Sequence, residues 1–285
     1  MMRALCSVLI GAIAWHGGGA AVAADAVSPW RATYNSKARV VAGLAGGPSG
    51  SLHLYAGIEI ALEPGWKTYW RMPGDAGGIA PTFAFEGSKN LMSATVLYPA
   101  PARLSDAAGD SVGYKSRVVF PVRLVAQNPA EPIELAVQFE YGICREICVP
   151  AEVALALTIA GGLSSPAPDQ LAKALAAVPS KASALKPRDP VLVAARVDLA
   201  TSKVLVDVRY ASPTTDADLF VESPDGIYLP LPRKVAVGAG TVTFEIEMAD
   251  GISPAELSEK TLVFTMVGGG GQSEATWTAP AIRAP

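Results

Sequence analysis

The stretch IELAVQFEYGICREICVPAEVALAL, residues 133–157, has an alternating hydrophobic pattern on either side of a short turn. Hydrophobic residues recur at every second position, which is the pattern of β-strands with one buried face. Cys144 ends the first run and Cys148 begins the second, with three residues between them. A turn of this length can bring two Cα atoms within the span of a disulfide. The stretch therefore predicts an antiparallel hairpin with both cysteines at its tip or edge.

The same period of two recurs along the rest of the chain. In the first half it is clearest in the runs 51–62, 116–125 and 133–139, which are separated by turn residues. From residue 190 onward, five further runs are rich in β-branched and aromatic residues: 191–199, 203–210, 218–223, 241–248 and 261–267. Many short strands joined by turns favour β-sandwiches, and a second unit of about 95 residues is close to an immunoglobulin-like domain in size.

The segment between these two groups of strands has a different composition. GGLSSPAPDQ, residues 161–170, is typical of a linker, and Asp169 is the predicted N-cap of a short helix. We therefore predict an all-β protein with two immunoglobulin-like β-sandwich domains joined by a short helical linker. The expected boundaries are a signal peptide at 1–24, a first sandwich at 25–160, the linker at 161–189 and a second sandwich at 190–285.

The N-terminus is typical of a secretory signal peptide. Arg3 provides the positive charge, an apolar run covers 4–15, and the small residues at 21–23 form a cleavage site. The apolar run is shorter than the roughly 20 residues that a membrane span needs. We expect the mature protein to be exported, which in a bacterium means to the periplasm.

Cleavage of the leader removes Cys6 and leaves Cys144 and Cys148 as the cysteines of the mature chain. Two cysteines in an oxidising compartment are expected to pair. The loop-entropy model gives only about 2 kcal/mol for a loop of about five residues, so this bridge would stabilise the fold weakly. Tight exposed bridges are easily reduced, which favours a redox role. A structural role stays open.

Two other kinds of function stay open at this point. A non-catalytic β-sandwich would use its loops to hold a sugar or a partner protein. Two thiolates would also suit Cu(I), with Met72 as a further ligand. We expect no resident metal and no cofactor besides the disulfide.

Composition and charge exclude other classes of protein. Half of the 285 residues are hydrophobic and only 17% are charged, which excludes a disordered chain. The net charge of −3 is not the basic footprint of a nucleic-acid-binding protein.

A second informative stretch is GWKTYWRMPGDAGG, residues 65–78. Three large aromatic residues, Trp66, Tyr69 and Trp70, lead into a loop that is rich in proline and glycine and contains Asp75. Core packing explains one set of the aromatic residues, but it does not explain the loop. We therefore predict that the loop covers a reactive site or forms a shelf for a ligand.

Four motifs of the first domain together point to a known family. They are G-W-K-T-Y-W-R-M-P-G-D-A-G-G at 65–78, Y-P-A-P-x-R at 98–103, G-Y-x-x-x-V-x-x-P at 113–121 and Y-x-x-C-x-x-x-C-x-P at 141–150. In this order they resemble the N-terminal periplasmic domain family of the DsbD/ScsB type, the thiol:disulfide interchange proteins. The second β domain is similar to the longer ScsB-like architecture.

The resemblance implies an immunoglobulin-like fold whose cysteine pair, here Cys144 and Cys148, passes electrons. It also implies a membrane-embedded DsbD/ScsB-like electron donor and periplasmic acceptors that are thioredoxin-like proteins or disulfide isomerases. The resemblance further implies that an aromatic-bearing loop shields the cysteines between encounters. The residues expected to shield the site or to bind the partner are Trp66, Tyr69, Trp70, Asp75 and Tyr141.

Full-length members of the family continue into a multi-span membrane region, which this sequence lacks. We therefore expect a separate module that obtains its electrons from another protein. Pro150 follows Cys148 closely and cannot donate a ladder hydrogen bond, which indicates an exposed edge. On this ground we favour attack of a partner thiolate on Cys148, with Cys144 as the resolving cysteine, and the reverse assignment stays open.

Overall fold

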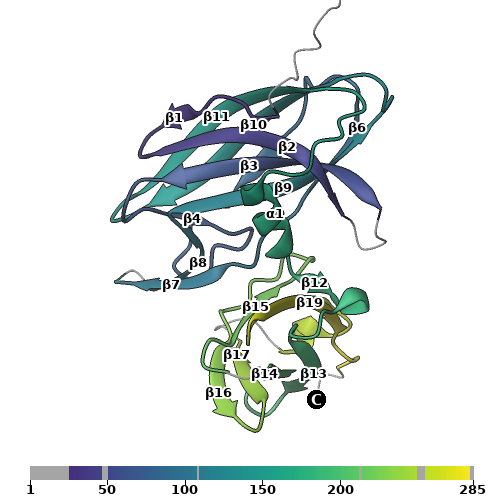
Figure 1. Ribbon diagram of the computed structural model, residues 1–285. Coiled ribbons are helices and arrows are strands. Elements are labelled where there is room, and N and C mark those ends of the chain that lie inside the picture. The colour runs from purple at the N-terminus through teal and green to yellow at the C-terminus, as the bar shows by residue number, and fades with distance from the viewer. Residues whose placement is uncertain (1–25, 47–50, 108, 212–213, 249–253, 283–285) are drawn as a thin grey trace, which may run out of the picture.

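The computed structural model shows two β-sandwiches that follow one another along the chain (Figure 1). The predicted fold class is confirmed, because the described strands form two immunoglobulin-like sandwiches with a short helix between them. The predicted signal peptide at 1–24, with Cys6, lies outside the described residues. The residues that the structure describes are 26–46, 51–107, 109–211, 214–248 and 254–282.

The first sandwich packs two antiparallel sheets against each other. One has the order β1-β2-β3-β9-β6; the other has the order β11-β10-β4-β8-β7, with β5 also paired to β10. The strands of the first sheet are β1 (Arg31–Thr33), β2 (Ser36–Gly46), β3 (Leu52–Leu62), β9 (Arg117–Ala126) and β6 (Leu91–Val96). Those of the second are β11 (Cys148–Ile159), β10 (Ile133–Cys144), β4 (Lys67–Tyr69), β8 (Gly109–Lys115), β7 (Ala102–Asp106) and β5 (Thr82–Ala84).

The second sandwich has two four-stranded sheets, with the orders β12-β19-β18-β15 and β13-β14-β17-β16. The strands of the first are β12 (Ser180–Lys181), β19 (Gly271–Thr278), β18 (Thr261–Gly268) and β15 (Asp218–Glu222). Those of the second are β13 (Val191–Asp198), β14 (Lys203–Arg209), β17 (Thr241–Glu247) and β16 (Arg233–Val237). Two short 3-10 turns occupy Ala182–Ala184 and Pro254–Leu257.

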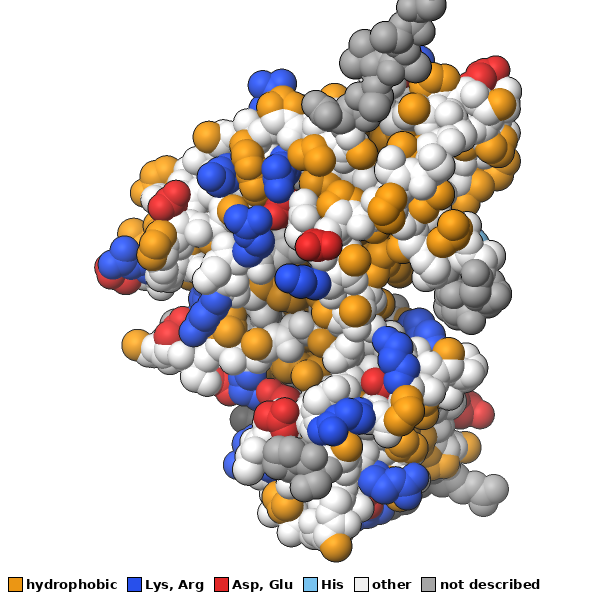
Figure 2. All heavy atoms as spheres, in the orientation of Figure 1, with side chains coloured by type: hydrophobic (Ala, Val, Ile, Leu, Met, Phe, Trp, Pro, Cys, Tyr) orange, Lys and Arg blue, Asp and Glu red, His pale blue; other side chains and the backbone are white. Residues whose placement is uncertain are grey.

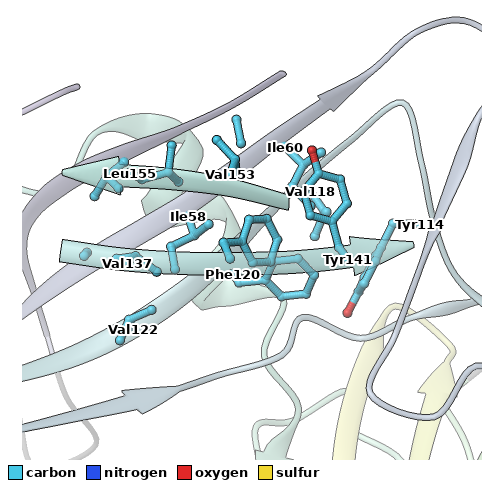
Figure 3. Close-up of a cluster of buried hydrophobic side chains, with 14 of the residues drawn as sticks. Ile58, Ile60, Tyr114, Val118, Phe120, Val122, Val137, Tyr141, Val153 and Leu155 are labelled. Carbon is cyan, nitrogen blue, oxygen red and sulfur yellow. The ribbon is translucent and has the colours of Figure 1, made fainter. Parts of the chain in front are cut away.

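The core of the first sandwich follows from strand alternation. Successive side chains of a strand point to opposite faces, and along β10 the residues Leu135, Val137, Phe139 and Tyr141 are all buried. Phe120 of β9 meets them from the opposite sheet (Figure 3), and its ring centroid lies 6.4 Å from that of Phe139. This packing fixes the path of β10 and hence the position of its last residue.

The helix α1 (Asp169–Ala176) covers one face of the first sandwich. Leu171 is fully buried there against Val41 and Val119, so the helix is docked rather than free. Asp169, which we expected as the N-cap, is instead the first helical residue. Its carboxylate lies in the first turn, where the helix dipole favours negative charge.

The backbone before the helix is also held by the first sandwich. The Leu44 amide donates to the Ser165 carbonyl at 2.9 Å, and the Ala167 amide donates to the Leu44 carbonyl at 2.8 Å. At the other end of the expected linker, β12 pairs in parallel with β19 of the second sandwich. The expected linker at 161–189 is therefore attached to both sandwiches, although its composition is typical of a flexible tether.

The exposed part of this segment gives a first prediction. Residues 181–188 are all exposed, and exposed connections are where proteases cut most readily. Limited digestion with a protease of broad specificity should first cut within 182–187 and leave α1 attached to the first sandwich. Mass spectrometry of the two fragments gives the position of the cut. An earlier cut between residues 30 and 155 would contradict the division into two units.

Among the described residues, no helix has the length and apolar character that a membrane crossing requires.

Candidate functional site: the hairpin-tip disulfide

The two cysteines face each other at the end of the β10–β11 hairpin. The strands pair in unbroken register from Ile133 opposite Ile159 to Cys144 opposite Cys148. The Cα atoms of the cysteines are 4.1 Å apart and their sulfurs form a disulfide, so the predicted pairing is confirmed. Their position at the tip follows from the alternation on both sides of the turn, because the core fixes the register.

The two sulfurs differ in accessibility. β10 is an inner strand, with β11 on one side and Lys67 of β4 opposite Cys144 on the other, and Cys144 is only 7% exposed. β11 is the edge of its sheet, and Cys148 is exposed. Ile147 beside it is 73% exposed. An approaching molecule therefore meets Cys148 first.

Tyr69 of β4 reaches across the outer face of β10 to this disulfide. Its hydroxyl lies 3.0 Å from Cys148 Sγ, although the ring itself is only 2% exposed. Because a sulfur in a disulfide carries no hydrogen, the phenol is the donor. Burial and then the negative charge of Asp106 raise the pKa of Tyr69, so the phenol keeps its proton at neutral pH.

Two glycines make room for the Tyr69 ring. A Cβ atom on Gly78 would lie 2.3 Å from the ring, and a Cβ atom on Gly142 would lie 3.1 Å from it and 2.8 Å from Ile79. The Gly142 amide also donates to the Ile79 carbonyl at 3.1 Å. We call Tyr69, Gly78 and Ile79 the cover of the disulfide, and residues 70–81 the cover loop.

A buried lysine joins the strand of Tyr69 to the neighbouring hairpin. Lys67 Nζ donates to Asp106 at 2.6 Å and to Ser111 at 2.7 Å. The cover loop lies along the same hairpin, since the Ala76 amide donates to the Asp110 carbonyl at 3.0 Å. The cover is thus supported from the β7–β8 side.

The structure places the other predicted site residues at different distances from this site. Trp66 is half-buried beside the turn, where it lines an open groove of about 570 Å³ with Arg145 and packs edge-on against Tyr34. Tyr141 is fully buried, and its hydroxyl lies 2.9 Å from that of Ser36. Tyr141 therefore ties β10 to the opposite sheet from inside the core.

Trp70 and Asp75 make their contacts with the second sandwich. The Trp70 ring is 1% exposed and packs against Phe220, with centroids 5.8 Å apart. The Asp75 carboxylate accepts hydrogen bonds from the Leu231 amide and from the Tyr228 hydroxyl, both at 3.0 Å. The loop that we predicted as a cap therefore packs against the Tyr69 ring at one end and binds the second sandwich in its middle.

Sequence reasoning missed Gly78 and Gly142 as parts of the site, and it did not single out Arg71 and Arg103. A glycine inside a strand often marks a place where another group approaches the backbone closely, so Gly142 carried a readable signal. The partners of the two arginines in the second sandwich lie more than a hundred positions further along the chain. No local pattern connects them.

No group of three or more His, Cys, Asp or Glu side chains in the described part of the chain is arranged to hold a metal ion. Met72, the further copper ligand that we considered, packs against the core of the first sandwich.

Comparison with known proteins adds four findings. Residues 53–160 match the family model described as thiol:disulfide interchange protein DsbD, N-terminal, and residues 177–281 match a model described as a domain of unknown function. The crystal structure of the N-terminal periplasmic domain of ScsB from Proteus mirabilis is similar in fold, with a TM-score of 0.67 and 21% identity. That match covers 90% of this chain and 100% of the other. No curated protein matches the chain.

Fold and site together define a protein of two immunoglobulin-like sandwiches with a disulfide at the tip of an edge hairpin. More particularly, residues 53–160 of its first sandwich match the N-terminal domain family of DsbD, as the four motifs predicted.

Proposed function

We propose that this protein exchanges disulfides with other proteins through Cys148 and Cys144. The observation that carries the proposal is the difference in solvent exposure between the two cysteines. Cys148 is exposed at a sheet edge, whereas Cys144 is only 7% exposed. Thiol–disulfide exchange needs access to one sulfur and a second cysteine close enough to resolve the intermediate. The hairpin tip meets both requirements.

The reduction of the module proceeds in two balanced steps. A thiolate of a donor dithiol attacks Cys148 Sγ, the Cys144–Cys148 bond breaks, and Cys144 leaves as a thiolate. The second thiol of the donor then attacks the donor's own sulfur in the mixed disulfide, which releases Cys148 as a thiolate. Two electrons have passed to the module, and the donor is oxidised. Delivery to an acceptor disulfide runs in reverse, with Cys144 as the resolving thiol.

Tyr69 supports this exchange when the cysteine pair is reduced. A phenol that donates to the disulfide sulfur at 3.0 Å is placed to donate to the Cys148 thiolate once it forms. Hydrogen bonds to charged groups contribute about 1.5–3 kcal/mol. The phenol would therefore favour the nucleophilic form of Cys148 at neutral pH.

The cellular setting follows from the same proposal. The module acts in the periplasm, takes electrons from a membrane-embedded DsbD/ScsB-like protein and passes them to thioredoxin-like proteins or disulfide isomerases. The family of the first sandwich and the fold shared with a periplasmic domain of ScsB support this setting.

The experiment uses the two single-cysteine variants. A thioredoxin-like partner with one active-site cysteine, activated as a thionitrobenzoate mixed disulfide, is mixed with Cys144→Ser or Cys148→Ser, and release of the chromophore is followed. Cys144→Ser, which keeps the exposed sulfur, should react roughly a hundredfold faster than Cys148→Ser, a difference of about 2.7 kcal/mol in barrier.

Equal rates, or a faster Cys148→Ser variant, would contradict the assignment of the two roles. If neither variant forms the mixed disulfide and the wild-type bridge has a reduction potential below about −300 mV, the bridge is structural. The protein is then better described as a binding module.

A further inference from the structure

One face of β15 is turned away from the core of its own sandwich. Leu219 and Val221 belong to that core. Phe220, which points the opposite way, is 1% exposed and belongs instead to the buried cluster of the first sandwich. Because strand side chains alternate, Asp218 and Glu222 share the face of Phe220.

Two arginines of the first sandwich meet this face. Arg71 of the cover loop donates to Glu222 at 2.6 and 2.8 Å and to Glu274 of β19 at 2.7 Å. Arg103 of β7 donates to Asp218 at 2.8 and 3.1 Å. Forked pairs of this kind fix direction as well as distance.

These ion pairs join the first sandwich to the second. Figure 2 shows one face of the molecule, on which charged side chains lie beside hydrophobic ones between the two sandwiches. The side chains of Arg71, Glu222 and Glu274 are only 27%, 17% and 11% exposed. Partly buried pairs are screened less by salt than pairs on an open surface. The contact between the sandwiches therefore combines hydrophobic packing with ion pairs that fix the orientation of one sandwich relative to the other.

The second sandwich holds the cover loop at two points, Arg71 and Asp75. Arg71 lies two residues after Tyr69, and Asp75, which accepts the Leu231 amide, lies three residues before Gly78. Arg103 holds the β7–β8 hairpin, which carries the Asp110 carbonyl that the loop bonds. The second sandwich thus binds both the cover loop and the β7–β8 hairpin that supports it. The same loop packs against the Tyr69 ring.

We infer that the second sandwich is a brace for the cover: by holding Arg71 and Arg103 it keeps Tyr69 against the disulfide and limits the rate at which thiols reach Cys148. Arg71 is in this sense a positioning residue, because it acts on the reacting sulfur through Tyr69. The inference rests on the proposed function only in taking Cys148 as the attacked sulfur.

The test changes the second sandwich alone. In the double variant Asp218→Asn/Glu222→Gln the sequence of the first sandwich is intact, but both arginines lose a charged partner. The matched control is Asp207→Asn/Glu245→Gln, which removes the same charges from ion pairs of the same sandwich with Arg196, Lys203 and Arg233.

The measured quantity is the rate at which dithiothreitol reduces the oxidised full chain. One thiolate attacks Cys148, Cys144 leaves, and the second thiol closes the dithiothreitol ring and releases Cys148. We expect the double variant to be reduced about tenfold faster than wild type, and the control at the wild-type rate. Exchange of the Gly142 amide hydrogen, which is bonded to the Ile79 carbonyl, should accelerate in the same proportion.

A double variant that is reduced at the wild-type rate would overturn the brace, and so would an equal acceleration in the control. The single variant Glu222→Gln, with an expected rise of about threefold, gives the same test if the double variant does not fold. Dithiothreitol needs no protein partner, so this measurement and the exchange with a thioredoxin-like protein can fail separately.

Discussion

Gly142→Ala should move the Tyr69 ring away from Cys148 and raise the rate at which small thiols reduce the disulfide roughly thirtyfold. The added Cβ would lie 2.8 Å from Ile79 and 3.1 Å from the Tyr69 ring, on a strand whose neighbours leave no room. Overpacking of this kind costs about 1–3 kcal/mol. The cover can relieve it by moving away, and about 2 kcal/mol corresponds to that factor in rate. Stopped-flow reduction by dithiothreitol measures the change.

Gly46→Ala is the matched control, because a Cβ at the end of β2 meets no atom of the described residues within 4 Å. It should be reduced at the wild-type rate. If Gly142→Ala is reduced no faster than Gly46→Ala and keeps its thermal stability, Tyr69 does not limit access to Cys148.

Phe120→Ala should lower the free energy of unfolding of the first sandwich by about 3–5 kcal/mol, the usual range for a buried phenylalanine. The side chain is fully buried, and its ring centroid lies 5.5 Å from that of Phe83, 5.6 Å from that of Tyr98 and 5.6 Å from that of Tyr114. The neighbouring rings belong to several elements, so they cannot all move in to fill the cavity. Urea unfolding followed by tryptophan fluorescence measures the loss.

Leu52→Ala removes a hydrophobic side chain from β3 that is 67% exposed, and its effect should stay within about 0.5 kcal/mol. A loss for Phe120→Ala that is no larger than this would mean that the two sheets do not depend on the Phe120 cluster.

Much of the hairpin could be predicted from residues 133–157. The alternation before Cys144 and after Cys148 fixes which face of each strand is buried, and the three residues between them leave one short turn. Strand geometry imposes the period of two whatever the rest of the chain does. The pairing of Cys144 with Cys148 could be predicted for the same reason, because their partners in the sheet are set by the register.

The candidate site was predictable only in part. The aromatic stretch at 65–78 drew attention to Tyr69, which does contact Cys148. The same stretch made Trp70 and Asp75 equal candidates, and the structure directs both to the second sandwich. Neighbours in sequence point to different places once a chain leaves a strand and enters a loop, since no fixed period then relates their side chains.

The sequence by itself determined the fold class, the disulfide and the family of the first sandwich, because each rests on residues that are close together or on a repeated local period. Pro150 indicated an exposed edge at Cys148, but only the tertiary structure decided that Cys144 is buried and what Arg71 binds. Accessibility depends on which strand lies at the edge of a sheet. Arg71 binds Glu222, which lies 151 positions away in the sequence. Contacts over such separations form only when two complete sandwiches pack against each other. The residues around Arg71 therefore contain no pattern that would predict its partner.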